Sequence, residues 1–142
     1  LARLSRELEL PLLFHVSEPV GHDYPGKQGL PMADFYAFVK AHPDCTVIGA
    51  HWAGGLPLYG VMPELADELD NVWFDTAATT LLYDDAIYER VIETIGADRI
   101  VFASDFPLLN QKKQLERVRE LKLDQSAVEG IVGGNAARLL GL

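Results

Sequence analysis

"TVIGAHWAGG", residues 46–55, places an apolar, β-branched run directly before His51, Trp52 and two glycines. Such a run, bounded by glycines, is typical of a strand that is buried on both faces. Two other stretches repeat the pattern. "LPLLFHVSEP" at 10–19 ends its apolar run at His15, and "IVFASDFP" at 100–107 ends it near Asp105. Three predicted strands therefore end in a residue that can bind a metal ion or transfer a proton.

Strand and helix patterns alternate along the chain. The predicted strands, rich in Val, Ile, Leu and Phe without polar alternation, are 10–16, 45–51, 72–76 and 99–104. The predicted helices are 31–42, 57–69, 84–95, 111–121 and 126–132. Consecutive strands start about 27 to 35 residues apart, which is the size of a βα unit. The pattern predicts an α/β fold with a parallel sheet built from βα units.

The first ten residues, "LARLSRELEL", have the pattern of an amphipathic helix with Leu1, Leu4 and Leu8 on one face. The sequence starts without Met. We therefore expect these residues to be the end of a helix within a longer protein.

Composition limits the classes of protein to consider. The length of 142 residues suits one domain, and 49% hydrophobic residues suffice for a substantial core. A net charge of −9 argues against a nucleic-acid partner, because phosphate binding needs a basic surface. No apolar run approaches the roughly 20 residues that span a bilayer, so no membrane partner is expected. Cys45 is the one cysteine, which fits a reducing cytoplasm.

The strand-end residues are expected to share one site. Active sites of parallel α/β folds lie at the carboxyl ends of the strands. Because side chains alternate between the two faces of a sheet, His51 is expected on the face of Gly49 and Val47, and Ile48 towards the helices. Burying a polar group without a partner costs roughly 2–7 kcal/mol. A single buried histidine is most simply a hydrogen-bonded core residue, but three polar residues at equivalent strand ends indicate a shared function.

Ligand chemistry suggests what that function is. The imidazoles of His15 and His51 and the carboxylate of Asp105 suit zinc or a similar divalent ion with one open position. Such an ion lowers the pKa of bound water to about 7, and a neighbouring histidine or carboxylate can transfer the proton. The sequence contains no GxSxG nucleophile motif and no GxGxxG phosphate loop.

Four further residues near the strand ends are predicted to contact a small-molecule substrate or to support the site: Glu18, His22, Trp52 and Asp75. Each also has a structural interpretation. Glu18 could cap its loop, His22 could be an exposed loop residue, and Asp75 could hydrogen-bond the loop that follows it. Trp52 could pack in the core, as aromatic residues at strand ends often do.

Five motifs together resemble the second half of amidohydrolase-related proteins: "FHVSEP", "IGAHWAGG", "WFDTAA", "VFASDFP" and "GNAARLLGL". This branch of the amidohydrolase superfamily contains metal-dependent hydrolases and nonoxidative decarboxylases of carboxylated rings. The resemblance covers Leu10 to Leu142. It implies strands five to eight of a (β/α)₈ TIM barrel. It also implies that His15 is a metal ligand, that His51 is a second ligand or the proton-transferring histidine, and that Asp105 is a ligand and the catalytic acid/base.

The sequence departs from the family in one respect. The family carries a His-x-His pair on its first strand, and none of the four histidines here forms one. A complete barrel has about 250 residues. Residues 1–142 are therefore expected to be a partial domain that lacks the N-terminal half of the barrel. No lysine ends a predicted strand to bridge two metals, so a mononuclear site is expected.

These features predict a metal-dependent hydrolase that uses a metal-activated water on a small carboxylated or cyclic substrate. A nonoxidative decarboxylase on the same scaffold, or a catalytically incomplete half-barrel, is the alternative. A flavodoxin-like domain would also explain the alternation, but no glycine-rich anion-binding turn follows the first strand. The two open sheet edges of a half-barrel predict a homo-oligomer or aggregation, because unpaired edge strands associate.

Overall fold

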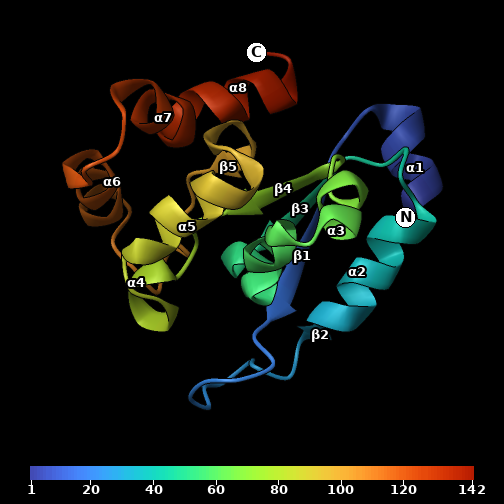
Figure 1. The fold of residues 1–142 in the computed structure, drawn as a ribbon, viewed down its shortest axis with the longest axis horizontal. Coiled ribbons are helices and arrows are strands. Elements are labelled where there is room, and N and C mark those ends of the chain that lie inside the picture. The colour runs from blue at the N-terminus through green and yellow to red at the C-terminus, as the bar shows by residue number, and fades with distance from the viewer.

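The computed structural model describes all residues, Leu1–Leu142, and contains one parallel sheet with helices around it (Figure 1). Its strands are β1 (Leu12–Ser17), β2 (Leu30–Pro31), β3 (Val47–Ala50), β4 (Val72–Asp75) and β5 (Ile100–Val101). They are arranged in the order β2-β1-β3-β4-β5, and every neighbouring pair is parallel. The predicted fold class is confirmed. The two-residue strand β2 was not predicted.

The helices are α1 (Ala2–Leu8), α2 (Met32–Ala41), α3 (Pro63–Glu68), α4 (Thr79–Leu82), α5 (Ala86–Ile95), α6 (Gln111–Glu120), α7 (Gln125–Glu129) and α8 (Asn135–Leu140). Shorter or irregular helical segments are η1 (His51–Val61), η2 (Ala97–Arg99) and η3 (Gly130–Gly134). The helix predicted over 57–69 is only partly correct, because η1 continues to Val61 and the regular helix begins at Pro63. No helix combines the length and the hydrophobicity that crossing a bilayer requires.

One face of the sheet packs against α2. The ring of Phe14 on β1 lies 5.8 Å from that of Phe35 and 4.9 Å from that of Phe38, both on α2. Phe14 pairs with Gly49 on β3. A Cβ atom added to Gly49 would lie 3.1 Å from the Phe35 ring, so Gly49 faces the same helix. The helix-facing side of β1 and β3 is therefore a closely packed apolar layer.

This packing corrects one prediction about the strand ends. Val47 and Gly49 face α2, whereas Ile48 pairs with Leu13 on the opposite side of the sheet. The predicted faces of these β3 residues were therefore wrong. His51 does not follow their alternation, because its φ of 56° is left-handed and the strand has already ended at Ala50. Strict alternation holds only while the backbone stays extended.

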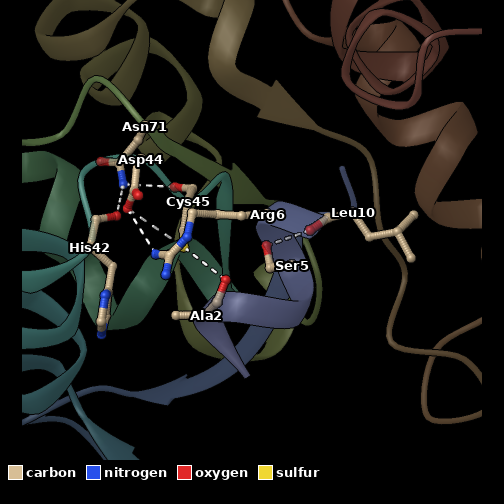
Figure 2. A network of polar contacts seen from close by, with 8 residues as sticks. All are labelled: Ala2, Ser5, Arg6, Leu10, His42, Asp44, Cys45 and Asn71. Carbon is tan, nitrogen blue, oxygen red and sulfur yellow. Dashed lines mark hydrogen bonds and ion pairs between the residues drawn. The ribbon is translucent and has the colours of Figure 1, made fainter. Parts of the chain in front are cut away.

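Polar contacts join the segments that precede the strands, at the end of the sheet opposite to their carboxyl ends (Figure 2). The Arg6 guanidinium on α1 donates to Asp44 Oδ1 at 3.1 Å, just before β3. The side-chain amide of Asn71, just before β4, donates to the carbonyls of His42 at 3.1 Å and Cys45 at 2.8 Å. These bonds attach α1 and β4 to the start of β3, and they involve none of the predicted site residues.

Apolar side chains are exposed along the β1 side of the molecule. Leu13 on β1 is 63% exposed and lies on the sheet face opposite to α2. The apolar residues of α1 are exposed as well: Leu1 at 83%, Leu4 at 51% and Leu8 at 61%. Val47 on β3 and Val101 on β5 are buried, at 0% and 6% exposure.

We predict that the isolated chain associates through this exposed surface. Covering roughly 400 Å² of apolar surface at about 25 cal/mol per Å² is favourable by about 10 kcal/mol. That is similar to the whole net stability of a domain, about 5–15 kcal/mol. Light scattering at micromolar concentration should therefore detect dimers or larger species.

Leu8→Lys should shift this distribution towards smaller species. The matched control is Val61→Lys, which changes a side chain that is 74% exposed on η1 and should have little effect. A monodisperse monomer of the unmodified chain that melts cooperatively would contradict the prediction.

Candidate functional site

The chain makes a left-handed turn where β3 ends. The φ angles are 56° at His51, 57° at Trp52, 47° at Ala53, 65° at Gly54 and 90° at Gly55. Residues other than glycine pay roughly 1–2 kcal/mol each for left-handed helical conformations. At Gly54 a side chain is also excluded, because a Cβ atom would lie 2.7 Å from the carbonyl oxygen of Ser17. The turn is therefore strained and needs other contacts to hold it.

Asp75, at the end of β4, supplies such contacts. Its Oδ1 accepts hydrogen bonds from the backbone N–H of His51 at 2.8 Å and of Ala77 at 3.0 Å. The side chain is buried, and Asp75 is only 4% exposed. Burial raises the pKa of Asp75, and the hydrogen bonds from the two backbone N–H groups oppose that rise. Asp75 thus acts on His51 through the backbone.

The same region orients the His51 ring. His51 Nδ1 lies 3.2 Å from the carbonyl oxygen of Ala77. A carbonyl oxygen only accepts, so Nδ1 carries the hydrogen and donates it. Nε2 then has a free lone pair and lies 3.0 Å from Nδ1 of His15 on β1. The other nitrogen of His15, Nε2, lies 3.1 Å from the carbonyl oxygen of Gly26. The two histidines face each other through one nitrogen each.

His15, His51 and Asp105 lie in the wall of one cavity of about 420 Å³. The complete lining is His15, His22, Tyr24, Pro25, His51, Ala78, Leu81, Leu82, Asp105 and Leu108. Asp105 has a φ of 60° and Ala78 a φ of 54°, so left-handed residues follow β4 and β5 as well as β3. The structure brings the three strand-end residues together, as their positions in the sequence led us to expect.

Of the other four predicted site residues, only one lines the cavity. His22 lines the cavity, whereas Glu18, Trp52 and Asp75 do not. Trp52 has no exposed surface, and its Nε1 donates to Thr79 Oγ1 at 2.9 Å, so it packs beneath the site. Glu18 accepts hydrogen bonds from two tyrosines. The structure thus gives Trp52 and Asp75 supporting positions in place of contact with the cavity.

Several wall residues were missed by sequence reasoning: Tyr24, Pro25, Ala78, Leu81, Leu82 and Leu108. Tyr24 and Pro25 lie in the same loop as His22, which was the one signal that could have identified them. The apolar residues carry no motif. Their role follows only from the folding of α4 and the loop after β5 over the strand ends.

The donors suit a divalent ion but do not complete a site. The 3.0 Å between His15 Nδ1 and His51 Nε2 is short enough for both to bind one ion, since metal–nitrogen bonds are about 2.0–2.1 Å. However, no group of three His, Cys, Asp or Glu side chains is arranged to hold an ion. Asp105 lines the same cavity but does not form a three-residue metal-binding group with the two histidines. The residues of this chain therefore fit part of a metal site.

Replacing Asp75 tests whether its carboxylate holds the turn. Asp75→Ala removes the acceptor of two buried N–H groups. Unsatisfied buried groups cost about 1–3 kcal/mol each, so we expect the free energy of unfolding in urea to fall by about 2–6 kcal/mol. Asp75→Asn keeps Oδ1 and should retain most of the stability. Equal losses in both variants would contradict the assigned role.

The raised pKa of Asp75 also predicts a pH dependence. The folded chain holds this proton more tightly than the unfolded chain does. The resulting stability is fully present below the unfolded pKa of about 3.9 and is lost as the pH rises through the folded pKa. Asp75→Asn does not titrate, so its stability relative to wild type should increase with pH across that window. A difference that stays constant from about pH 4 to pH 8 would show that the carboxyl is not perturbed.

Comparison with known proteins gives the family. The family model described as "Amidohydrolase" matches residues 1–142. No significant relative was found among curated protein sequences.

Solved structures share the fold. A dihydroxybenzoic acid decarboxylase from Polaromonas sp. JS666, with bound manganese and the inhibitor 2-nitroresorcinol, has a TM-score of 0.76 at 18% identity, over 99% of this chain and 52% of that one. 5-Carboxyvanillate decarboxylase from Sphingomonas paucimobilis has a TM-score of 0.77 at 15% identity, over 99% and 52%. A TIM-barrel protein from Bordetella bronchiseptica has a TM-score of 0.74 at 21% identity, over 99% and 48%.

These structures have TIM-barrel folds of about twice the length covered here, so the chain spans about half of each. The parallel five-stranded sheet agrees with half of such a barrel. At this level of identity the structural likeness concerns the fold, and the match to the family model concerns the sequence itself. With that match over its whole length, the chain belongs to the amidohydrolase family.

Proposed function

We propose that the residues of this chain belong to a metal-dependent hydrolase. The enzyme would act on a small carboxylated or cyclic substrate. The observation that carries the proposal is the meeting of His15, His51 and Asp105 in one cavity of an amidohydrolase-family chain. Active sites of parallel barrels lie at this end of the strands. The chain spans about half of its structural relatives, so we assign the activity to the protein with a complete barrel.

We propose that His15 and His51 hold the ion with Asp105, and that the remaining ligands belong to the part of the barrel outside these residues. Imidazole and carboxylate donors favour zinc. The manganese of one structural relative makes manganese the second candidate. A bound divalent ion would polarise a substrate oxygen and acidify water.

The residues of the chain supply the rest of the chemistry. His51 has one available lone pair, on Nε2, because Nδ1 is committed to the carbonyl of Ala77. That lone pair can bind the ion or, where other ligands hold the ion, accept a proton. The Asp105 carboxylate stands in the same wall and can hold or return a proton. The side chains of Leu81, Leu82 and Leu108 give the cavity an apolar wall against which the apolar part of a substrate can pack.

Nonoxidative decarboxylation is a second candidate on the same residues. Two observations favour it: the apolar wall suits a flat ring, and two of the similar folds are decarboxylases of aromatic acids. Release of carbon dioxide from a carboxylated aromatic acid, as opposed to water-dependent cleavage of an amide or ester, distinguishes the two reactions.

We place the protein in the cytoplasm, because Cys45 is buried and has no disulfide partner.

Metal content tests the proposal. In the protein with a complete barrel, His15→Ala should reduce tightly bound metal per chain at least tenfold. His42→Ala is the matched control, since His42 lies beside the start of β3 at the other end of the sheet and should leave the content unchanged. Equal metal content in both variants would contradict the assignment.

Asp105→Asn tests the proton-transfer role in the same protein. It keeps the shape of the side chain and removes its charge, so kcat should fall by about 100-fold or more. The control, Asp67→Asn, alters an exposed carboxylate on α3 and should leave kcat unchanged. Near-normal turnover of Asp105→Asn would show that Asp105 has only a structural role.

A further inference from the structure

Glu18 connects two walls of the cavity without lining it. Its Oε2 accepts a hydrogen bond from the Tyr24 hydroxyl at 2.6 Å, and its Oε1 accepts one from the Tyr83 hydroxyl at 3.1 Å. Tyr24 lies in the loop between β1 and β2 and lines the cavity. Tyr83 directly follows α4, which carries the wall residues Leu81 and Leu82. One carboxylate therefore links the loop that carries Tyr24 to the segment that follows α4.

The protonation of the two tyrosines favours this arrangement. Burial, followed by the hydrogen bond to Glu18, raises the pKa of Tyr24 to about 12. Burial and the charge of Glu18 also raise the pKa of Tyr83. Both hydroxyls therefore keep their hydrogens at neutral pH and donate them. Hydrogen bonds from neutral donors to a carboxylate are stronger than those between neutral groups.

The loop that carries Tyr24 is otherwise held by contacts among its own residues and by β1, where His15 Nε2 lies 3.1 Å from the carbonyl oxygen of Gly26. Lys27 Nζ donates to the carbonyls of Gly21 at 2.9 Å and His22 at 2.7 Å. The same ammonium group lies 5.9 Å from the centre of the Tyr24 ring. These contacts give the loop a shape but do not connect it to α4. The Glu18–Tyr83 bond makes that connection, across 65 positions of the sequence.

We propose that Glu18 is a positioning residue: it holds the β1–β2 loop against the segment after α4 and so fixes Tyr24 and His22 in the cavity wall. The distance between that loop and Leu81 and Leu82 then sets which ring-sized ligands fit. Glu18 touches no reacting atom and acts only through Tyr24 and Tyr83. The inference rests on the proposed function only in treating this cavity as the substrate site.

Limited trypsin digestion of the chain tests the positioning directly. In wild type the Lys27 side chain is committed to two carbonyls of its loop, which should slow cleavage there. Glu18→Gln loses an acceptor for one tyrosine, and Tyr83→Phe loses the bond to the α4 side. Both should speed cleavage after Lys27 at least threefold and leave cleavage after Lys112, on α6, unchanged. Glu64→Gln, an exposed carboxylate on α3, is the matched control.

Ultraviolet titration of the tyrosines measures the pKa of Tyr24. It distinguishes loss of the Glu18 contact from a general loosening of the fold. Tyr24→Phe should remove the transition of Tyr24, and Glu18→Gln should shift that transition to lower pH, because the Glu18 carboxylate adds to the effect of burial in raising the pKa of Tyr24. If Glu18→Gln speeds cleavage at every site, Tyr24→Phe decides the question: faster cleavage confined to Lys27 supports the proposal. Unchanged cleavage at Lys27 in both Tyr24→Phe and Tyr83→Phe overturns it.

Kinetics in the protein with a complete barrel separate this inference from the proposed function. Glu18→Gln should raise KM at least fivefold and change kcat less than twofold, because the reacting groups stay in place. A fivefold fall in kcat with KM unchanged would overturn the positioning role. Absence of any hydrolysis or decarboxylation in wild type would refute the proposed function, while the digestion and titration results would still decide the role of Glu18.

Discussion

The pair of hydrogen bonds that Asp75 accepts from His51 and Ala77 organises the functional end of this sheet. Without an acceptor at that place, two backbone N–H groups would be buried without partners beside a turn that is already strained. With it, the carbonyl of Ala77 is in position to accept from His51 Nδ1. One carboxylate at the end of β4 thus determines the direction in which the histidine at the end of β3 presents its free nitrogen.

The two ends of the sheet differ in what their polar groups do. Before β3 and β4, Arg6 and Asn71 are paired with Asp44 and with backbone carbonyls, which holds the scaffold together (Figure 2). At the carboxyl ends, His15, His51 and Asp105 face a cavity. This division is the one expected of a parallel barrel, in which stability and function occupy opposite ends of the strands. Loops at the carboxyl ends of barrel strands can vary in sequence while the fold stays intact.

Much of this could be predicted from the sequence, since hydrophobic runs and their polar last residues are local features. The strand positions and the meeting of His15, His51 and Asp105 follow from them. The face on which His51 lies could not be predicted, because alternation ends where the backbone becomes left-handed. The Glu18–Tyr83 contact was also missed. It joins residues 65 positions apart, and no periodicity encodes such a pairing.

Paramagnetic NMR of the histidine rings tests whether the strand ends form one cation site, as proposed above. Manganese added below one equivalent should broaden the ring signals of His15 and His51 first and leave those of His42 sharp, because His42 lies beside the start of β3. His22, in the cavity wall, should broaden after them. Equal broadening of all four histidines, or of His42 before His15 and His51, would show that the strand ends do not form a cation site.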